Sequence, residues 1–188
     1  MHRTLFTTAA ALALATFTTP ALAADTYELD TAHTAIVFNV DHAGRSFTWG
    51  RFNDIAGEFT IDEENPENSS FSFTVQAESI DTNNRRRDGH LRSADFFNVN
   101  RFPEITLNST AVEPIEDGLR VTADLTLLGE TREVTFDLTK MGEGEQRGQF
   151  YVGYDTQLTI QRSDFGMTYG LAGIGDDVNL HVSFEGAR

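Results

Sequence analysis

Residues 119–127 read LRVTADLTL, a stretch in which every second residue is apolar. Leu, Val and Ala alternate there with Arg, Thr and Asp, which is the period of a β-strand that buries one face. A helix would repeat its apolar positions every three or four residues instead. This stretch therefore predicts a half-buried strand.

The same alternation recurs along most of the chain. Further apolar rows of period two begin at Ile36, Phe71, Val134, Phe150 and Val178. With Thr48–Ile61 as one strand bent near Gly57, and Ile105–Ala111 as another, the chain has about eight antiparallel strands. Eight strands either close into a barrel or form a two-sheet sandwich, and periodicity does not separate the two. Glycines between residues 141 and 149 predict a turn there.

Residues 79–103, SIDTNNRRRDGHLRSADFFNVNRFP, interrupt the alternation. Asp81 and Ser93 can each cap a helical turn, and Pro103 enforces an exit. The segment predicts a short helical insertion over about residues 81–98 that closes one end of a barrel. Four apolar side chains would turn inward as a plug: Leu91, Phe96, Phe97 and Phe102.

The same segment concentrates arginine in an acidic chain. A run of charge is typical of a solvated face. The alternative is that Arg87 or Arg92, partly shielded from water, pairs with the phosphate or carboxylate head group of a ligand.

The first 23 residues have the form of a signal peptide, with Arg3, an apolar run and Ala21-Leu22-Ala23 before the cleavage point. Cleavage after Ala23 leaves residues 24–188 as one domain and predicts export, with a bacterial periplasm as the compartment. No later run reaches the roughly 18 apolar residues of a membrane span, so we expect no stable membrane insertion.

The charge of the chain bears on its partners. Loss of Arg3 takes the formal net charge from −15 to −16. Such acidity predicts weak binding to nucleic acid and to anionic phospholipids, although it does not exclude a local basic site.

Few residue patterns in the chain suggest chemistry. The chain has no cysteine, which removes disulfides and thiol catalysis. Its histidines lack the spacing of a metal motif, so hydrogen-bonded roles are favoured over a metal site. Ser93, His90 and Asp88 are too close in sequence to adopt triad geometry, and no GxSxG is present. The sequence therefore predicts a protein that is not an enzyme and has no metal and no cofactor.

Taken together, these residues resemble the YceI-like family of bacterial periplasmic proteins, also called the polyisoprenoid-binding family. The resemblance covers nearly the whole mature chain and is strongest over residues 79–103. Its motifs are Asp30-Thr31-Ala32-His33, Asp81-Thr82, Arg87-Asp88, His90-Leu91, Ser93, Asp95-Phe96-Phe97, Phe102-Pro103 and Arg162–Met167. Arg85 and Arg86 depart from the family pattern and leave the head group open.

The resemblance implies an extended, eight-stranded, antiparallel lipocalin-like β-barrel that holds a long amphiphile in its lumen. The apolar rows suit such a ligand, because each buried methylene contributes about 0.8 kcal/mol. We expect ligand contacts in the lumen and at its mouth from Phe38, Val40, His42, Phe71, Phe73, Val75, Leu91, Phe96, Phe97, Phe136, Phe165 and Met167. Head-group contacts are expected from Arg87 and Arg92.

The function expected on these grounds is a periplasmic carrier of an isoprenoid, quinone or fatty-acid-like molecule, without catalysis. One alternative is a quinone-presenting accessory of membrane electron transport. Another is a stress-related interaction protein whose cavity is incidental. The oligomeric state stays open, a homodimer included.

Overall fold

The computed structural model describes residues 24–188, and the predicted signal peptide, residues 1–23, lies outside the described part. The strands are β1 (Asp25–Leu29), β2 (Ala35–His42), β3 (Ser46–Phe52), β4 (Ile55–Ile61), β5 (Ser70–Gln76), β6 (Ile80–Asp81), β7 (Glu104–Ile115), β8 (Gly118–Leu127), β9 (Glu130–Gln146), β10 (Gln149–Gln161) and β11 (Ile174–Ala187). The helical elements are α1 (Arg85–Leu91) and the 3-10 turns Pro66–Asn68, Ala77–Ser79 and Arg162–Phe165.

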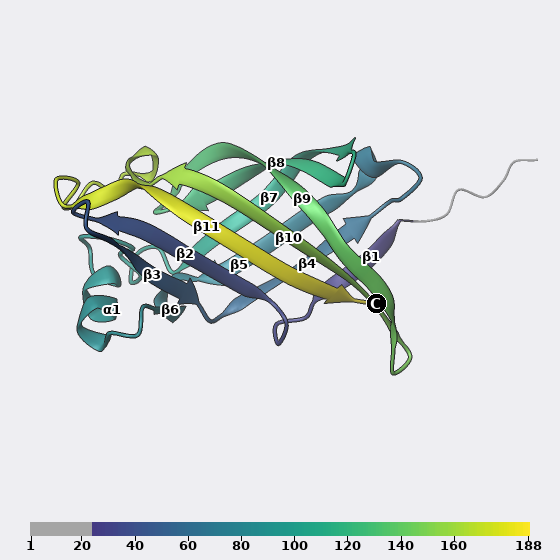
Figure 1. Cartoon of the computed structure of the whole chain (residues 1–188), viewed down its shortest axis with the longest axis horizontal. Helices are drawn as coiled ribbons and strands as arrows, with labels where there is room; N and C mark the ends of the chain where they lie inside the picture. The colour runs from purple at the N-terminus through teal and green to yellow at the C-terminus, as the bar shows by residue number, and fades with distance from the viewer. Residues whose placement is uncertain (1–23) are drawn as a thin grey trace, which may run out of the picture.

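The strands close into an antiparallel barrel (Figure 1). Hydrogen bonds join β1, β4, β5, β7, β8, β9, β10 and β11 in this order, and β1 returns to β11 through the pair Leu29 and Gly186. Both β1 and β2 pair with β11, so β2 continues the path of β1 around the barrel. In the same way β3, which pairs with β2, continues the path of β4, and β6, which pairs with β3, continues the path of β5. The eleven strands of the described chain thus follow eight strand lines. The predicted all-β barrel of eight strand lines is therefore confirmed, and the sandwich is not formed.

The alternation of residues 119–127 takes the expected form in β8. Val121 and Ala123 face the interior and are fully buried. On the outer face, Arg120 forms a bidentate ion pair with Asp137 of the paired strand β9, at 2.7 and 2.9 Å. Burial of one face and solvation of the other fix the register, because a slip of one residue would exchange the faces.

The strand predicted over Thr48–Ile61 is interrupted earlier than expected. β3 ends at Phe52 and β4 begins at Ile55, so the break falls at residues 53–54 rather than near Gly57. Gly57 instead allows a close approach between β4 and β5. Its φ is +158°, and a Cβ there would lie 2.3 Å from the backbone oxygen of Ser72.

The helical insertion predicted over about residues 81–98 is present, but α1 itself is shorter. Its N-cap is Asn84 rather than Asp81: the Asn84 side chain accepts a hydrogen bond from the Arg87 N–H at 3.1 Å. After α1, the chain continues in hydrogen-bonded turns, such as that from the Phe96 N–H to the Ser93 carbonyl. No helix within residues 24–188 is long and apolar enough to cross a membrane.

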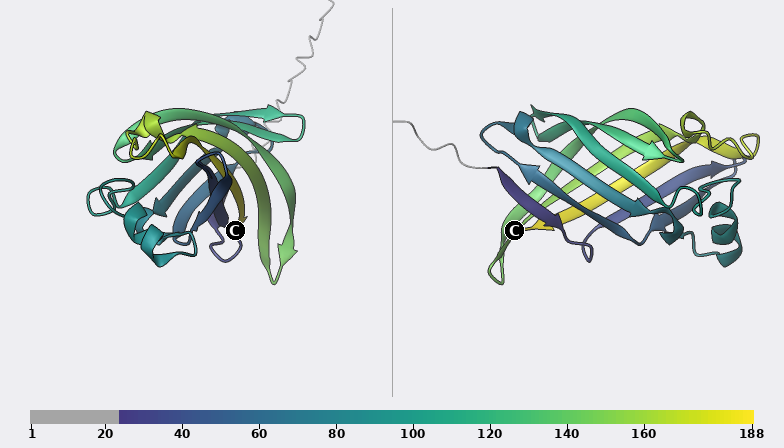
Figure 2. Two further views of the ribbon diagram at one scale, coloured as in Figure 1. Left: turned by 60° about the vertical axis from the view of Figure 1, so that its left-hand side comes forward. Right: turned by 180° about the vertical axis from the view of Figure 1, so that it is seen from behind.

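One end of the barrel is packed with aromatic side chains. Phe59 is 1% exposed, stacks on Tyr27 at a centroid distance of 5.2 Å, and meets Phe184 edge-on at 5.3 Å. We call this the closed end. At the other end lie α1, the β2–β3 hairpin and the β10–β11 loop (Figures 1 and 2). We call this the cavity end.

Candidate ligand-binding site

A cavity of about 680 Å³ occupies the half of the barrel beneath α1. Most of its lining is aliphatic or aromatic: Ile36, Phe38, Val40, Phe52, Phe73, Val75, Leu91, Phe96, Phe97, Ile105, Leu107, Leu125, Leu127, Leu158, Ile160, Met167, Ile174, Val178, Leu180 and Val182. The polar lining consists of His42, Thr48, Asn84, Arg86, Arg87, His90, Thr106 and Arg162. The volume of the cavity, and its apolar walls with few polar groups, are typical of a site for a small organic ligand.

The closed end forms the floor of this cavity. Phe73 lines the cavity and also contacts Phe184, at a centroid distance of 5.2 Å, and Phe71 at 6.3 Å. Phe71 and Phe184 are buried within the aromatic cluster. The lumen is therefore a blind pocket whose depth is limited at Phe73.

The structure places nine of the twelve expected lumen residues in the cavity wall. They are Phe38, Val40, His42, Phe73, Val75, Leu91, Phe96, Phe97 and Met167. Phe71 and Phe136 lie in the packed core of the closed end, and Phe165 is buried beside Met167 without lining the cavity. Phe102, expected in the plug, does not line the cavity either, and packs against Gly129.

The two arginines expected at a head group have different surroundings. Arg92 does not line the cavity, because its guanidinium donates to the carbonyls of Glu78 and Ile80 at 2.7 and 2.6 Å. Arg87 does line the cavity, although it donates to the hydroxyl and carbonyl of Thr82, each at 2.7 Å. Arg86, which the sequence singled out only as a departure from the family pattern, is exposed and also lines the cavity.

The insertion is fixed to the barrel by buried hydrogen bonds. Asp88 is 6% exposed and accepts from both the N–H and the hydroxyl of Thr82. His90 bonds instead to Asp95 at 2.8 Å, and the Ser93 hydroxyl accepts from the Asp95 N–H. Asp88 thus bonds to Thr82, whereas His90 and Ser93 both bond to Asp95, so no side-chain hydrogen bond links Ser93, His90 and Asp88 into a catalytic set in the described chain.

Arg162 is a cavity residue that sequence reasoning missed. It is 3% exposed, and its guanidinium donates four hydrogen bonds of 2.8–3.0 Å. The acceptors are the carbonyls of Met167, Tyr169, Ile174 and Gly175. Burial lowers the pKa of this guanidinium, and the nearby Asp176 opposes that shift. The sequence could have indicated that Arg162 faces the interior, because Arg162 continues the inward row of Leu158 and Ile160 with a period of two.

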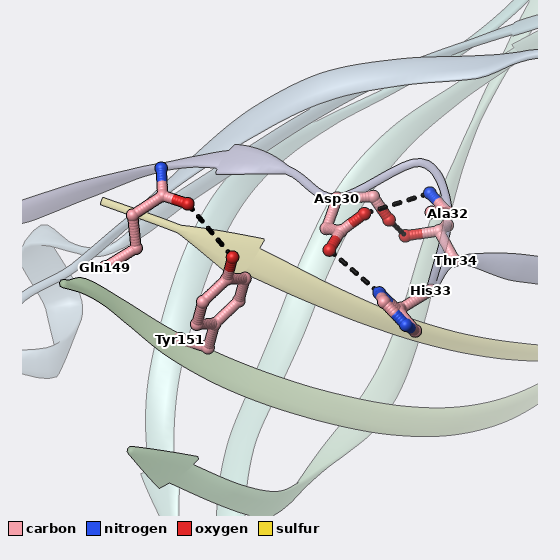
Figure 3. A network of polar contacts seen from close by, with 6 residues as sticks. All are labelled: Asp30, Ala32, His33, Thr34, Gln149 and Tyr151. Atoms are coloured by element: carbon pink, nitrogen blue, oxygen red, sulfur yellow. Dashed lines mark hydrogen bonds and ion pairs between the residues drawn. The ribbon is translucent and has the colours of Figure 1, made fainter. Parts of the chain in front are cut away.

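Among residues 24–188, one group could offer three ligand atoms to a metal ion: Asp30, His33 and Glu185, within 4.8 Å of one another. Figure 3 shows the loop between β1 and β2 in which two of them lie. The carboxylate of Asp30 accepts from the Ala32 N–H and from His33 Nδ1, both at 2.9 Å. These bonds account for the position of both side chains, and the group lies apart from the cavity lining.

A closed antiparallel barrel with a blind apolar cavity at one end defines a lipocalin-like class of binding protein. Residues 27–186 match the YceI-like domain, so the chain belongs to the YceI-like family. A UPF0312 protein of Pseudomonas aeruginosa is 41% identical, covering 96% of this chain and 97% of that protein. Protein YceI of Salmonella arizonae is 38% identical, with 94% of each chain covered.

Solved structures agree with the fold. The YCEI protein of Campylobacter jejuni, as a mutant, superposes with a TM-score of 0.72 at 28% identity, covering 86% of this chain and 97% of that one. BcnA of Burkholderia cenocepacia superposes with a TM-score of 0.77 at 22% identity, covering 84% of this chain and 98% of that one. A polyisoprenoid binding domain from Saccharophagus degradans superposes with a TM-score of 0.61 at 17% identity, covering 85% of this chain and 97% of that one. At these lower identities the last two show a shared fold.

Proposed function

We propose that this protein is an exported, single-domain carrier that holds an isoprenoid or a similar long-chain amphiphile in its barrel and performs no catalysis. The observation that carries the proposal is the blind cavity, about 680 Å³ in volume and lined mainly by apolar side chains. The polyisoprenoid binding domain of Saccharophagus degradans, which shares the fold, supports this ligand class. The leader predicted over residues 1–23 supports export to a periplasm.

The size of the cavity limits the ligand. At roughly 30 Å³ for each carbon-sized group, similar to the volume per molecule in liquid water, it has room for roughly 20 carbons. The hydrocarbon would fill the pocket down to Phe73, and the polar end would lie at the mouth beside Arg86 and Arg87. A quinone with a short isoprenoid tail would fit the same cavity.

Mass spectrometry of lipids extracted from the purified protein tests the proposal. We expect a long-chain amphiphile, or uptake of farnesol or geranylgeraniol by protein that was stripped of lipid. Leu180→Trp should fill the cavity and reduce uptake. Val37→Trp is the matched control, since Val37 lies on the outer face of β2 between the lining residues Ile36 and Phe38. Stripped protein that takes up neither alcohol would overturn the proposal.

A further inference from the structure

The cavity end exposes an unusual amount of apolar surface. Phe47 and Trp49, on the outer face of β3, are 55% and 57% exposed. Tyr169 and Leu171, in the β10–β11 loop, are 47% and 41% exposed. Only one other large hydrophobic side chain within residues 24–188 is as exposed, Met141, which lies on β9 toward the closed end. Exposed apolar groups gathered on one part of a surface mark a site of interaction.

These side chains lie on segments that border the cavity. Thr48, between Phe47 and Trp49, lines the cavity, as does His42 on the paired strand. The ring of Tyr169 in the β10–β11 loop packs at a centroid distance of 5.3 Å against His90 of α1, which also lines the cavity. Figures 1 and 2 show the β2–β3 hairpin, α1 and the β10–β11 loop at the same end of the barrel.

Exposed arginines accompany the apolar groups. Arg45 at the tip of the β2–β3 hairpin and Arg85 in the first turn of α1 are exposed, and neither has a side-chain hydrogen bond or ion pair in the described chain. Several carboxylates at this end are engaged internally, such as Asp88 with Thr82. Asp164 and Asp177 are exposed there and keep the end mixed in charge.

The closed end is different, because its loops are strongly acidic. The β4–β5 and β7–β8 connections carry Asp62, Glu63, Glu64, Glu67, Glu116 and Asp117. β10 alone, with 13 residues, spans about 40 Å between the two ends. The Debye length is only about 8 Å at physiological ionic strength, so a surface that meets the cavity end is screened from the acidic one.

We propose that the cavity end docks on anionic phospholipid bilayers, with Phe47, Trp49, Tyr169 and Leu171 in the interface and Arg45 and Arg85 against the head groups. Aromatic side chains with one polar edge favour the bilayer interface, and exposed arginines add attraction to anionic lipid. The entrance would then face the phase from which an amphiphile is taken up. The purpose of docking rests on the proposed carrier function, whereas docking itself does not.

Trp49 makes the proposal directly testable, since it is the only tryptophan in the chain. Mature protein without ligand is mixed with vesicles of phosphatidylcholine containing about one third phosphatidylglycerol, at physiological salt. We expect a blue shift of Trp49 emission and quenching by brominated lipid. The double variant Trp49→Phe/Met141→Trp moves the reporter toward the closed end and should show neither effect.

Charge and apolar contact are separated with further variants. Arg45→Gln/Arg85→Gln removes two charges and should weaken binding to these vesicles by about thirtyfold. Phe47→Ser should weaken binding to pure phosphatidylcholine vesicles as well. Arg147→Gln, at the exposed β9–β10 hairpin of the closed end, is the control and should change nothing.

An emission spectrum of Trp49 that the anionic vesicles leave unchanged would overturn the docking proposal. So would a concentration-dependent dimer in sedimentation that buries Trp49 in the absence of lipid. Uptake of farnesol, measured without vesicles, tests the carrier function separately. A protein that takes up farnesol without binding vesicles contradicts docking alone, and one that binds vesicles while remaining empty contradicts only the carrier function.

Discussion

Arg86 is the residue whose place at the cavity gives it the clearest expected role in binding. It is exposed, lines the entrance, and has no side-chain hydrogen bond or ion pair among the described residues. Arg87 shares the entrance but is engaged with Thr82. A guanidinium without a partner can form charge-assisted hydrogen bonds to a phosphate.

We therefore expect Arg86→Gln to weaken binding of farnesyl pyrophosphate by about tenfold, the scale of one charge-assisted hydrogen bond. Binding of farnesol, which has no charge, should not change. Arg85→Gln is the matched control, because Arg85 is also exposed but does not line the cavity. Displacement of a fluorescent lipid measures both affinities, and an equal loss for the two ligands would contradict the assignment.

The pair Asp30 and His33 gives a second prediction for single residues. The hydrogen bond between them raises the pKa of His33 and lowers the pKa of Asp30. A histidine whose pKa is raised by folding stabilises the fold at a pH below its pKa in the unfolded state, and this stabilisation is lost as the pH rises through its pKa in the folded state. A carboxylate whose pKa is lowered by folding stabilises the fold at a pH above its pKa in the unfolded state, and this stabilisation is lost as the pH falls through its pKa in the folded state.

The two contributions overlap between about pH 4 and pH 6.5. Titration of His33 by NMR should give a lower pKa in Asp30→Asn than in the parent protein. Asp155→Asn, which removes a carboxylate bonded to His181, should leave the His33 titration unchanged. A His33 pKa that does not respond to Asp30→Asn would show that the hydrogen bond is absent in solution.

At the scale of elements, the β10–β11 loop depends on Arg162. Its planar guanidinium satisfies four carbonyls at once, which a lysine ammonium with three donors in another geometry cannot do. Arg162→Lys should therefore lower the free energy of unfolding by about 2 kcal/mol or more, since buried carbonyls lose their partners. Urea denaturation measures this loss. Arg147→Lys on the exposed β9–β10 hairpin should change it by less than about 0.5 kcal/mol.

Sequence reasoning identified most strands because a period of two indicates which face of a strand is buried. The sequence did not predict β1, because the five residues of this strand contain only one buried side chain, Tyr27, and so show no alternation. The turn predicted over residues 141–149 was too long: β9 runs to Gln146, and the turn is Arg147-Gly148. Both turn residues have positive φ, 54° and 82°, which suits a two-residue hairpin.

Periodicity could not tell the two ends of the barrel apart. Phe71 and Phe73 face the same interior from β5, yet the first is packed in the closed end and the second lines the cavity. Depth along the barrel depends on how eight tilted strands are staggered on closure, which a single strand does not encode. For the same reason Phe136 was expected in the lumen site but lies in the core.

For the whole molecule, this division of the interior into a packed end and a hollow end predicts selectivity for chain length. Affinity for a series of linear prenols should rise with each added unit, because each buried methylene contributes about 0.8 kcal/mol. The rise should stop when the chain reaches Phe73. Prenols longer than this limit would leave their additional carbons in water at the mouth.

Phe73→Ala tests the limit, since it opens the floor of the cavity toward the aromatic cluster. The variant should lose stability by about 3–5 kcal/mol, and its affinity should continue to rise to longer prenols than in the parent protein. Phe136→Ala is the matched control: it removes the same side chain from the core of the closed end, at a position that does not itself line the cavity. Its chain-length limit should equal that of the parent, measured by calorimetry over the prenol series. If the affinity of Phe73→Ala and that of the parent stop rising at the same prenol length, Phe73 does not limit the depth of the pocket.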